Sequence, residues 1–167
     1  EENLIFKAAK ALQIASHTNY GAEIQLQKNI PIAAGLGGGS ADAAATLIGL
    51  NQLWGLNFSL EQLKKVASGI GSDVPFCLEG GTQLVSGWGE KVEKLPFLPL
   101  TNLWLVKVNT ALSAAQIYQL FDKLRAKTGA DSSLEKLLML WRLSPNEVYG
   151  KLAMFLKNDL EEAVFQL

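Results

Sequence analysis

The chain has 167 residues, of which 49% are hydrophobic and 19% charged, so it can bury a core and is not a disordered chain. Its net charge of −1 argues against a nucleic-acid-binding surface, because such a surface needs an excess of lysine and arginine. Cys77 is the only cysteine and no apolar stretch is long enough for a membrane span. The composition therefore predicts a soluble protein of a reducing compartment.

The first part of the chain combines helical and extended patterns. Asn3 and Ser59 are candidate N-caps, and Gly55 ends a helical pattern. Apolar and polar residues alternate over 24–30, as they do in a half-buried strand. The predicted elements are, in chain order, a helix over 4–16, a strand over 24–30, helices over 41–54 and 60–68, and strands over 81–86 and 91–95.

The second part begins at Pro96 and Pro99, which predict a domain boundary. A strand is predicted over 103–108, and helical patterns follow over 113–127 and from Ser132 and Ser144. These elements predict an α+β protein with two domains, residues 1–95 and 96–167. The chain starts without Met and stops inside a helical pattern, so we expect it to be a fragment of a longer protein.

A glycine-rich segment lies between the predicted strand and the helix that follows it. Glycine has no Cβ, so such a backbone can turn sharply and point successive N–H groups at an anion, and the helix start adds further N–H groups. The alternatives are a flexible linker and a packing turn without ligand. A P-loop is excluded because Gly39 stands where that motif needs lysine. The candidate phosphate-binding residues are Pro31, Ile32, Ala33, Ala34, Gly35, Leu36, Gly37, Gly38, Gly39, Ser40 and Ala41.

Residues 31–44 resemble the second motif of the GHMP kinases, the superfamily of galactokinase and of the homoserine, mevalonate and phosphomevalonate kinases. Residues 71–76 resemble the catalytic segment of the same family. The triple glycine at 37–39 is typical of the members that act on diphosphocytidyl-methylerythritol in non-mevalonate isoprenoid synthesis. Further similar stretches are residues 3–5, 50–54, 87–90 and 158–161.

The resemblance implies the two-domain α+β fold of the GHMP kinases. Residues 1–95 are expected to form part of an ATP-binding domain similar to ribosomal protein S5 domain 2. Residues 96–167 are expected to start a ferredoxin-like domain, and both domains are expected to be incomplete. The family's catalytic lysine segment would lie before Glu1. Ala41 replaces a common serine of the motif, and Ala114 replaces a common threonine after Ser113.

The resemblance also implies a reaction and its cofactors. ATP, with Mg²⁺, is expected to phosphorylate the 2-hydroxyl of diphosphocytidyl-methylerythritol. Asp73 is the candidate catalytic base, with an ordinary N-cap as the alternative. The Ser40 hydroxyl either caps its helix or reaches a phosphate or Mg²⁺. Tyr118 matches an aromatic that stacks on cytosine, with core packing as the alternative.

Two other functions stay open at this point. One is another GHMP kinase such as homoserine kinase, and the other is a non-catalytic binding domain of the same fold. The expected partner is a small molecule, without nucleic acid or membrane, and the oligomeric state is not predicted. The resemblance places the protein in the bacterial cytoplasm or the plastid stroma.

Overall fold

A computed structural model of the chain divides it into two compact units, Glu1–Phe97 and Leu98–Leu167. This division falls close to the boundary predicted at Pro96, but the assignment of the units to kinase domains stays a prediction. Each unit is considered by itself. The structure describes residues 3–32, 34–96, 104–106, 113–125, 147, 156 and 158–166.

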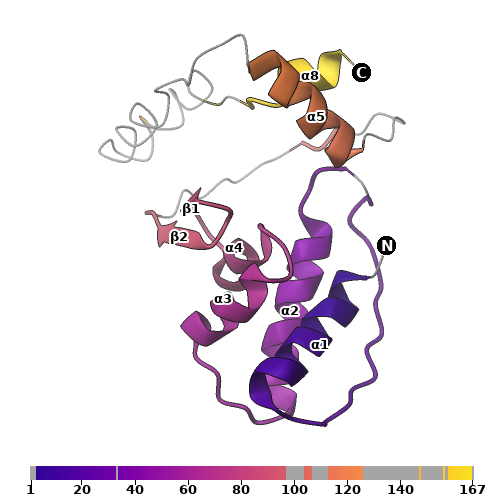
Figure 1. The fold of residues 1–167 in the computed structure, drawn as a ribbon, viewed down its shortest axis with the longest axis vertical. Coiled ribbons are helices and arrows are strands. Elements are labelled where there is room, and N and C mark those ends of the chain that lie inside the picture. The colour runs from indigo at the N-terminus through magenta and orange to yellow at the C-terminus, as the bar shows by residue number, and fades with distance from the viewer. Residues whose placement is uncertain are drawn as a thin grey trace. The chain divides into compact units, whose positions relative to one another are not determined.

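The described residues of unit 1 form four helices and one antiparallel hairpin (Figure 1). Gln83 pairs with Lys94 and Ser86 with Lys91, which makes a two-stranded sheet. Helix α2 begins at the end of the unit at which this hairpin lies (Figure 1). The elements are α1 Leu4–Ser16, α2 Gly38–Leu53, α3 Leu60–Ser68, α4 Val74–Glu79, β1 Gln83–Ser86 and β2 Lys91–Lys94.

The core of unit 1 lies where α1, α3 and α4 pack on α2. Leu12 of α1, Leu47 of α2 and Val74 of α4 are completely buried. Small residues at the contacts, such as Ala43 and Ala44, let the helix axes approach closely. This packing fixes α2 and α4, the two helices that carry the candidate site residues at their N-terminal ends.

Local capping signals agree with the sequence predictions in this unit. The Asn3 side chain accepts a hydrogen bond from the Ile5 N–H at 3.0 Å. Ser59 forms a full capping box with Gln62, in which each side chain bonds the other's backbone N–H. Asn51 bonds both backbone groups of Phe58 and so fixes the α2–α3 connection.

Two predictions about the glycine-rich region and its surroundings are wrong in detail. The helix starts at Gly38 with Gly37 as its N-cap, so Ser40 lies in the first turn and is no cap. Residues 24–30 form no strand, and all of them except Lys28 are exposed. A strand needs the hydrogen bonds of a neighbour, and β1 and β2 are the only strands of the described part, paired with each other.

In unit 2 the structure describes two helices, α5 Ala114–Arg125 and α8 Glu161–Phe165, which pack against each other. Ala163 of α8 is completely buried. Residues 104–106 are exposed and not extended in a sheet, contrary to the predicted strand. The helix predicted from Ser132, and most of the one from Ser144, lie outside the described residues. No helix in the described ranges is long and apolar enough to cross a membrane.

Candidate functional site

The glycine-rich segment forms a turn that leads directly into α2. Gly35 and Gly37 have φ angles of +69° and +65°, a backbone region that residues with a Cβ rarely adopt. Gly37 is the N-cap of α2, and no side chain caps this helix. A Cβ added to either glycine would meet no atom within 4 Å, so this face of the turn is open to a ligand.

The start of α2 presents backbone donors at this open turn. Ala41 donates to the Gly37 carbonyl at 3.0 Å, the first bond of the helix. The N–H groups of the preceding turn have no partner within the helix, and they sit at its positive end. Gly39 packs on α1, since a Cβ there would lie 3.3 Å from Leu4 Cδ1. Ala33, another predicted loop residue, lies outside the described residues.

Lys28 adds a positive charge beside this helix start. Its ammonium group forms an ion pair with Asp42 of α2, and both side chains are about three-quarters buried. A Cβ on Gly38 would lie 3.4 Å from Lys28 Nζ, so the cation lies against the backbone of the turn. The sequence reading missed this residue. The only indication in the sequence was that Lys28 breaks the apolar–polar alternation of the strand expected over 24–30.

Asp73 stands directly before α4, at the N-cap position, but it does not cap the helix. Its side chain accepts no capping hydrogen bond, and the residue is exposed. The capping alternative is therefore wrong, and the carboxylate stays available for another role. Burial raises the pKa of the nearby Cys77 thiol, and the negative charge of Asp73 raises it further, so Cys77 is a neutral thiol rather than a nucleophile.

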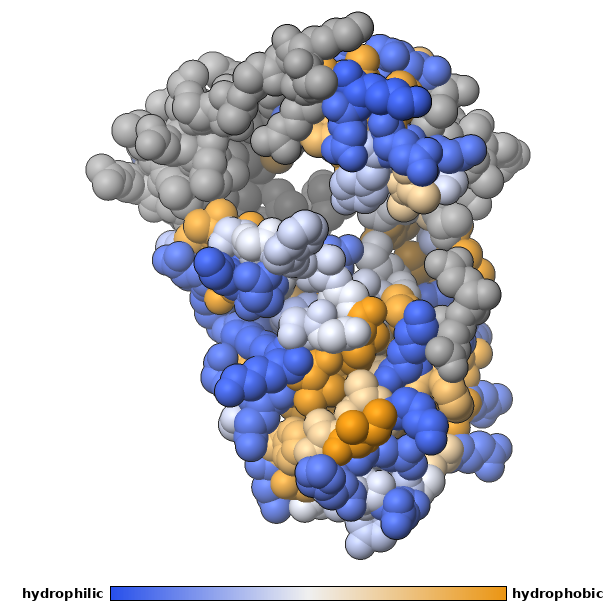
Figure 2. Space-filling view, in the orientation of Figure 1, coloured by the Kyte–Doolittle hydropathy of each residue, from blue (hydrophilic) through white to orange (hydrophobic). Residues whose placement is uncertain are grey.

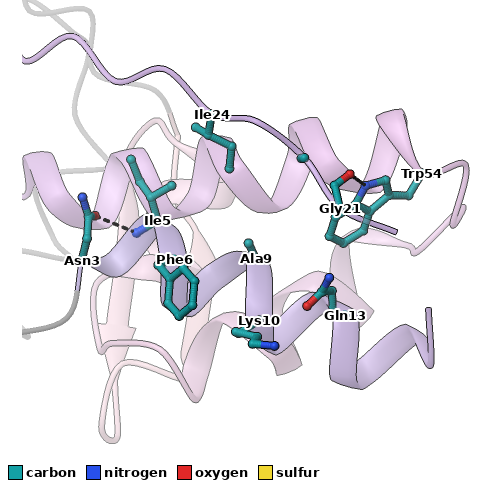
Figure 3. A pocket seen from close by; sticks show the side chains of 10 residues that line it. Asn3, Ile5, Phe6, Ala9, Lys10, Gln13, Gly21, Ile24 and Trp54 are labelled. Carbon is teal, nitrogen blue, oxygen red and sulfur yellow. Dashed lines mark hydrogen bonds between the residues drawn. The ribbon is translucent and has the colours of Figure 1, made fainter. Parts of the chain in front are cut away.

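A separate pocket of about 490 Å³ lies between α1 and the coil after it (Figure 3). Gln13 and Trp54 close it with hydrogen bonds to the coil, from Gln13 Nε2 to Tyr20 O and from Trp54 Nε1 to Gly21 O. Figure 2 shows apolar side chains gathered on one face of unit 1, between hydrophilic ones. No residue of the glycine turn or of segment 71–76 lines the pocket, so we assign it no part in the site.

Tyr118 belongs to α5 of unit 2 and is 57% exposed. The alternative of core packing is therefore wrong for this ring. Stacking on cytosine stays a prediction, as do the roles of all the candidate site residues. The part of the chain that the structure describes contains no cluster of three or more acidic, histidine or cysteine residues that could hold a metal ion.

Comparison with known proteins places this site in a family. Residues 3–81 match the model of the GHMP kinases N terminal domain. A curated relative from Caldanaerobacter subterraneus subsp. tengcongensis is 45% identical over 166 residues, which is 99% of this chain and 56% of the relative. One from Synechococcus is 45% identical over 97% of this chain and 53% of the relative. Both are named 4-diphosphocytidyl-2-C-methyl-D-erythritol kinase. The chain belongs to the GHMP kinase family.

A solved structure gives the same result for the fold. The crystal structure of 4-(cytidine 5′-diphospho)-2C-methyl-D-erythritol kinase is 29% identical and superposes with a TM-score of 0.64. The match covers 99% of this chain and 57% of that one. The α+β class and the GHMP kinase fold predicted from the sequence are confirmed. The chain spans about half the length of the curated relatives that it matches.

The geometry of this GHMP kinase turn fits an oligophosphate such as that of ATP. The turn is open, its helix start is uncapped, and a lysine lies against it. The fit to Mg²⁺ is weaker, because the acidic neighbour on α2, Asp42, is already paired with Lys28. Ser40, half-buried in the first turn of α2, supplies the one hydroxyl of the motif.

Proposed function

We propose that the protein transfers the γ-phosphoryl group of ATP to the 2-hydroxyl of diphosphocytidyl-methylerythritol, releasing ADP. The observation that carries this proposal is the open, uncapped glycine turn at the start of α2. The relatives named for this kinase support the substrate, since they are about 45% identical over nearly the whole chain. The relatives reported above carry the name of this kinase and of no other GHMP kinase.

The backbone N–H groups of the turn bind the phosphates in this proposal. These groups are fixed by the helix and need no reorganisation when an anion arrives, so they stabilise charge on the phosphates. Lys28 lies beside Gly38, where its ammonium group is shared between Asp42 and an anion bound at the turn. In phosphoryl transfer the protein mainly positions the reactants and stabilises charge, which this arrangement suits.

Asp73 takes the role of the general base in this proposal. As the 2-hydroxyl oxygen forms its bond to the γ-phosphorus, its proton passes to the Asp73 carboxylate, and the bond to the ADP oxygen breaks. The exposed carboxylate without a capping bond supports this role. The acceptor is a tertiary alcohol, a crowded and weak nucleophile, so both a base and accurate alignment help.

Two further assignments belong to the same proposal. Ser40 would hold Mg²⁺ together with the phosphates, and the ion would supply charge neutralisation. Tyr118 would offer its exposed ring to cytosine, a contact worth about 1–3 kcal/mol in comparable base stacking. The bacterial and cyanobacterial relatives agree with a bacterial cytoplasmic or plastid protein, which stays a prediction.

Phosphorus NMR of the full-length protein with Mg-ATP and diphosphocytidyl-methylerythritol tests the proposal. A new phosphomonoester signal that appears together with ADP is the expected result. Phosphoryl transfer to homoserine or mevalonate instead would support the kinase assignment and contradict the proposed substrate. ATP that stays unbound would show that the glycine turn is only structural.

A further inference from the structure

The tip of the β1–β2 hairpin touches the backbone directly before α4. Gly89 is the one buried residue of the turn 87–89, while its neighbour Trp88 is 91% exposed. A Cβ built on Gly89 would lie 2.7 Å from the carbonyl carbon of Ser72 and 2.8 Å from its Cα. The hairpin tip therefore rests on the peptide group that precedes Asp73.

Only glycine fits this position, for two separate reasons. The φ angle of Gly89 is +105°, which residues with a side chain rarely adopt. The neighbour at Ser72 is backbone, which cannot rotate away as a side chain can. Gly87 in the same turn is different: its φ of +69° is also positive, but the atoms nearest to a Cβ there belong to the flexible side chain of Glu90.

A second contact ties the hairpin to the other end of α4. The Gln83 side chain donates to the Phe76 carbonyl at 3.1 Å and to the Gly80 carbonyl at 2.6 Å. The hairpin is therefore attached before the first residue of α4 and at its last turn. Asp73 itself has no side-chain capping bond to hold it, so its position depends on the backbone around it.

We propose that the β1–β2 hairpin is a brace that sets the position of Asp73, with Gly89 as the positioning residue. The inference rests on the proposed function, in which Asp73 takes the proton of the acceptor hydroxyl. A backbone shift at Ser72 moves the carboxylate relative to the acceptor, and a misplacement of about 1 Å can lower a rate by about 100-fold. The turn belongs to α2, and the hairpin contacts described above reach only Ser72, Phe76 and Gly80, so ATP binding is expected to change little.

The test compares Gly89→Ala with Gly87→Ala in the full-length protein, assayed with Mg-ATP and diphosphocytidyl-methylerythritol. Gly89→Ala is expected to lower kcat by about 100-fold while the KM for ATP changes less than about threefold. Gly87→Ala, with the same kind of backbone strain in the same turn, is expected to keep kcat within a few-fold. Equal kcat losses in the two variants, or a loss that appears only in the KM for ATP, would overturn the brace.

Gln83→Ala covers the case in which Gly89→Ala does not fold. It removes the second attachment without any steric overlap, and it is expected to lower kcat several-fold with the KM for ATP unchanged. A wild-type kcat in Gln83→Ala, with Gly89→Ala unfolded, would overturn the inference. If the unmodified protein transfers no phosphate, the proposed function fails; if it does and the variants match it, only the brace fails.

Discussion

At the scale of single residues, the candidate site consists of polar groups at two helix starts that take no part in side-chain capping. Asp73 occupies an N-cap position and makes no cap. The glycine turn starts a helix that no side chain caps, although N-cap side chains commonly satisfy such N–H groups. Both groups face solvent, so neither needs a partner within the protein, and both stay accessible to a ligand.

The first prediction concerns the proposed base. Asp73→Asn removes the proton acceptor and is expected to lower kcat by about 10²- to 10⁴-fold. The fold is expected to remain, because the side chain is exposed and makes no capping bond. Steady-state ADP release of the full-length protein measures kcat, and circular dichroism measures whether the fold remains. Glu61→Gln, another exposed carboxylate in unit 1, is the control; full turnover in Asp73→Asn would remove Asp73 from the mechanism.

The second prediction concerns the lysine beside the turn. Lys28→Met removes a cation near the phosphates and leaves Asp42 as an unpaired negative charge. We expect the KM for ATP to rise by roughly tenfold or more, with little change in kcat. The double variant Lys28→Met/Asp42→Asn should recover part of this loss, because the repulsive carboxylate is gone. If the double variant is as weak as the single one, the charge of Asp42 is not the cause.

At the scale of elements, unit 1 is held by apolar packing, and among its described residues an ion pair connects α3 and α4. Lys64 of α3 contacts Glu79 of α4 at 2.8 Å, and the side chains are only 14% and 18% exposed. The hydrogen bond with Glu79 raises the pKa of Lys64, against an opposing effect of burial, and the hydrogen bond with Lys64 lowers the pKa of Glu79. The pair thus connects α3 to the helix that follows Asp73.

The third prediction is a pH dependence of stability that follows from this pair. The pKa of Glu79 is lower in the folded protein than in the unfolded one. Its charge therefore stabilises the fold at pH values above the unfolded-state pKa, and this stability is lost as the pH falls through the folded-state pKa. The pKa of Lys64 is higher in the folded protein than in the unfolded one. Its charge therefore stabilises the fold at pH values below the unfolded-state pKa, and this stability is lost as the pH rises through the folded-state pKa. At neutral pH both effects are present, so Glu79→Gln should lower the free energy of unfolding by about 1 kcal/mol.

Urea denaturation at several pH values measures this difference. The difference between wild type and Glu79→Gln should vanish in acid, once Glu79 is protonated. Glu61→Gln is the matched control, since Glu61 contacts the same lysine at 3.2 Å but is 77% exposed, so its loss should matter less. A difference that is the same at every pH would show that the Glu79 charge is not its source.

At the scale of the whole molecule, the chain forms two units, and the candidate phosphate turn and Asp73 both belong to unit 1. Within that unit α2 packs on α4, so the two helices that carry these residues share one core. A ligand that binds the turn therefore stabilises the fold of unit 1 as a consequence of mass action.

The fourth prediction uses this linkage. Mg-ATP at 100 times its dissociation constant should add about 2.7 kcal/mol to the stability of the unit that binds it. Amide hydrogen exchange of the full-length protein should therefore slow by up to about 100-fold in α2. A salt of equal ionic strength without nucleotide is the control. Unchanged exchange in α2 with saturating Mg-ATP would place the nucleotide elsewhere.

The sequence by itself determined the features that depend on neighbouring residues. The N-caps at Asn3 and Ser59, the bounds of α3, the hairpin and the glycine turn before α2 follow from short-range backbone and side-chain preferences. The resemblance over residues 31–44 and 71–76 was enough to identify the family. The pattern over 24–30 failed because a strand depends on a distant neighbour, which a local alternation does not reveal.

Only the tertiary structure decided the relations between segments that are far apart in the sequence. It placed Lys28 against Gly38, freed the Asp73 carboxylate from capping, and set Gly89 on the backbone of Ser72. Such contacts come from how elements pack, and many packings agree with the same local preferences. The conformation of the glycine turn therefore follows from its own residues, whereas the position of the proposed base is set by packing.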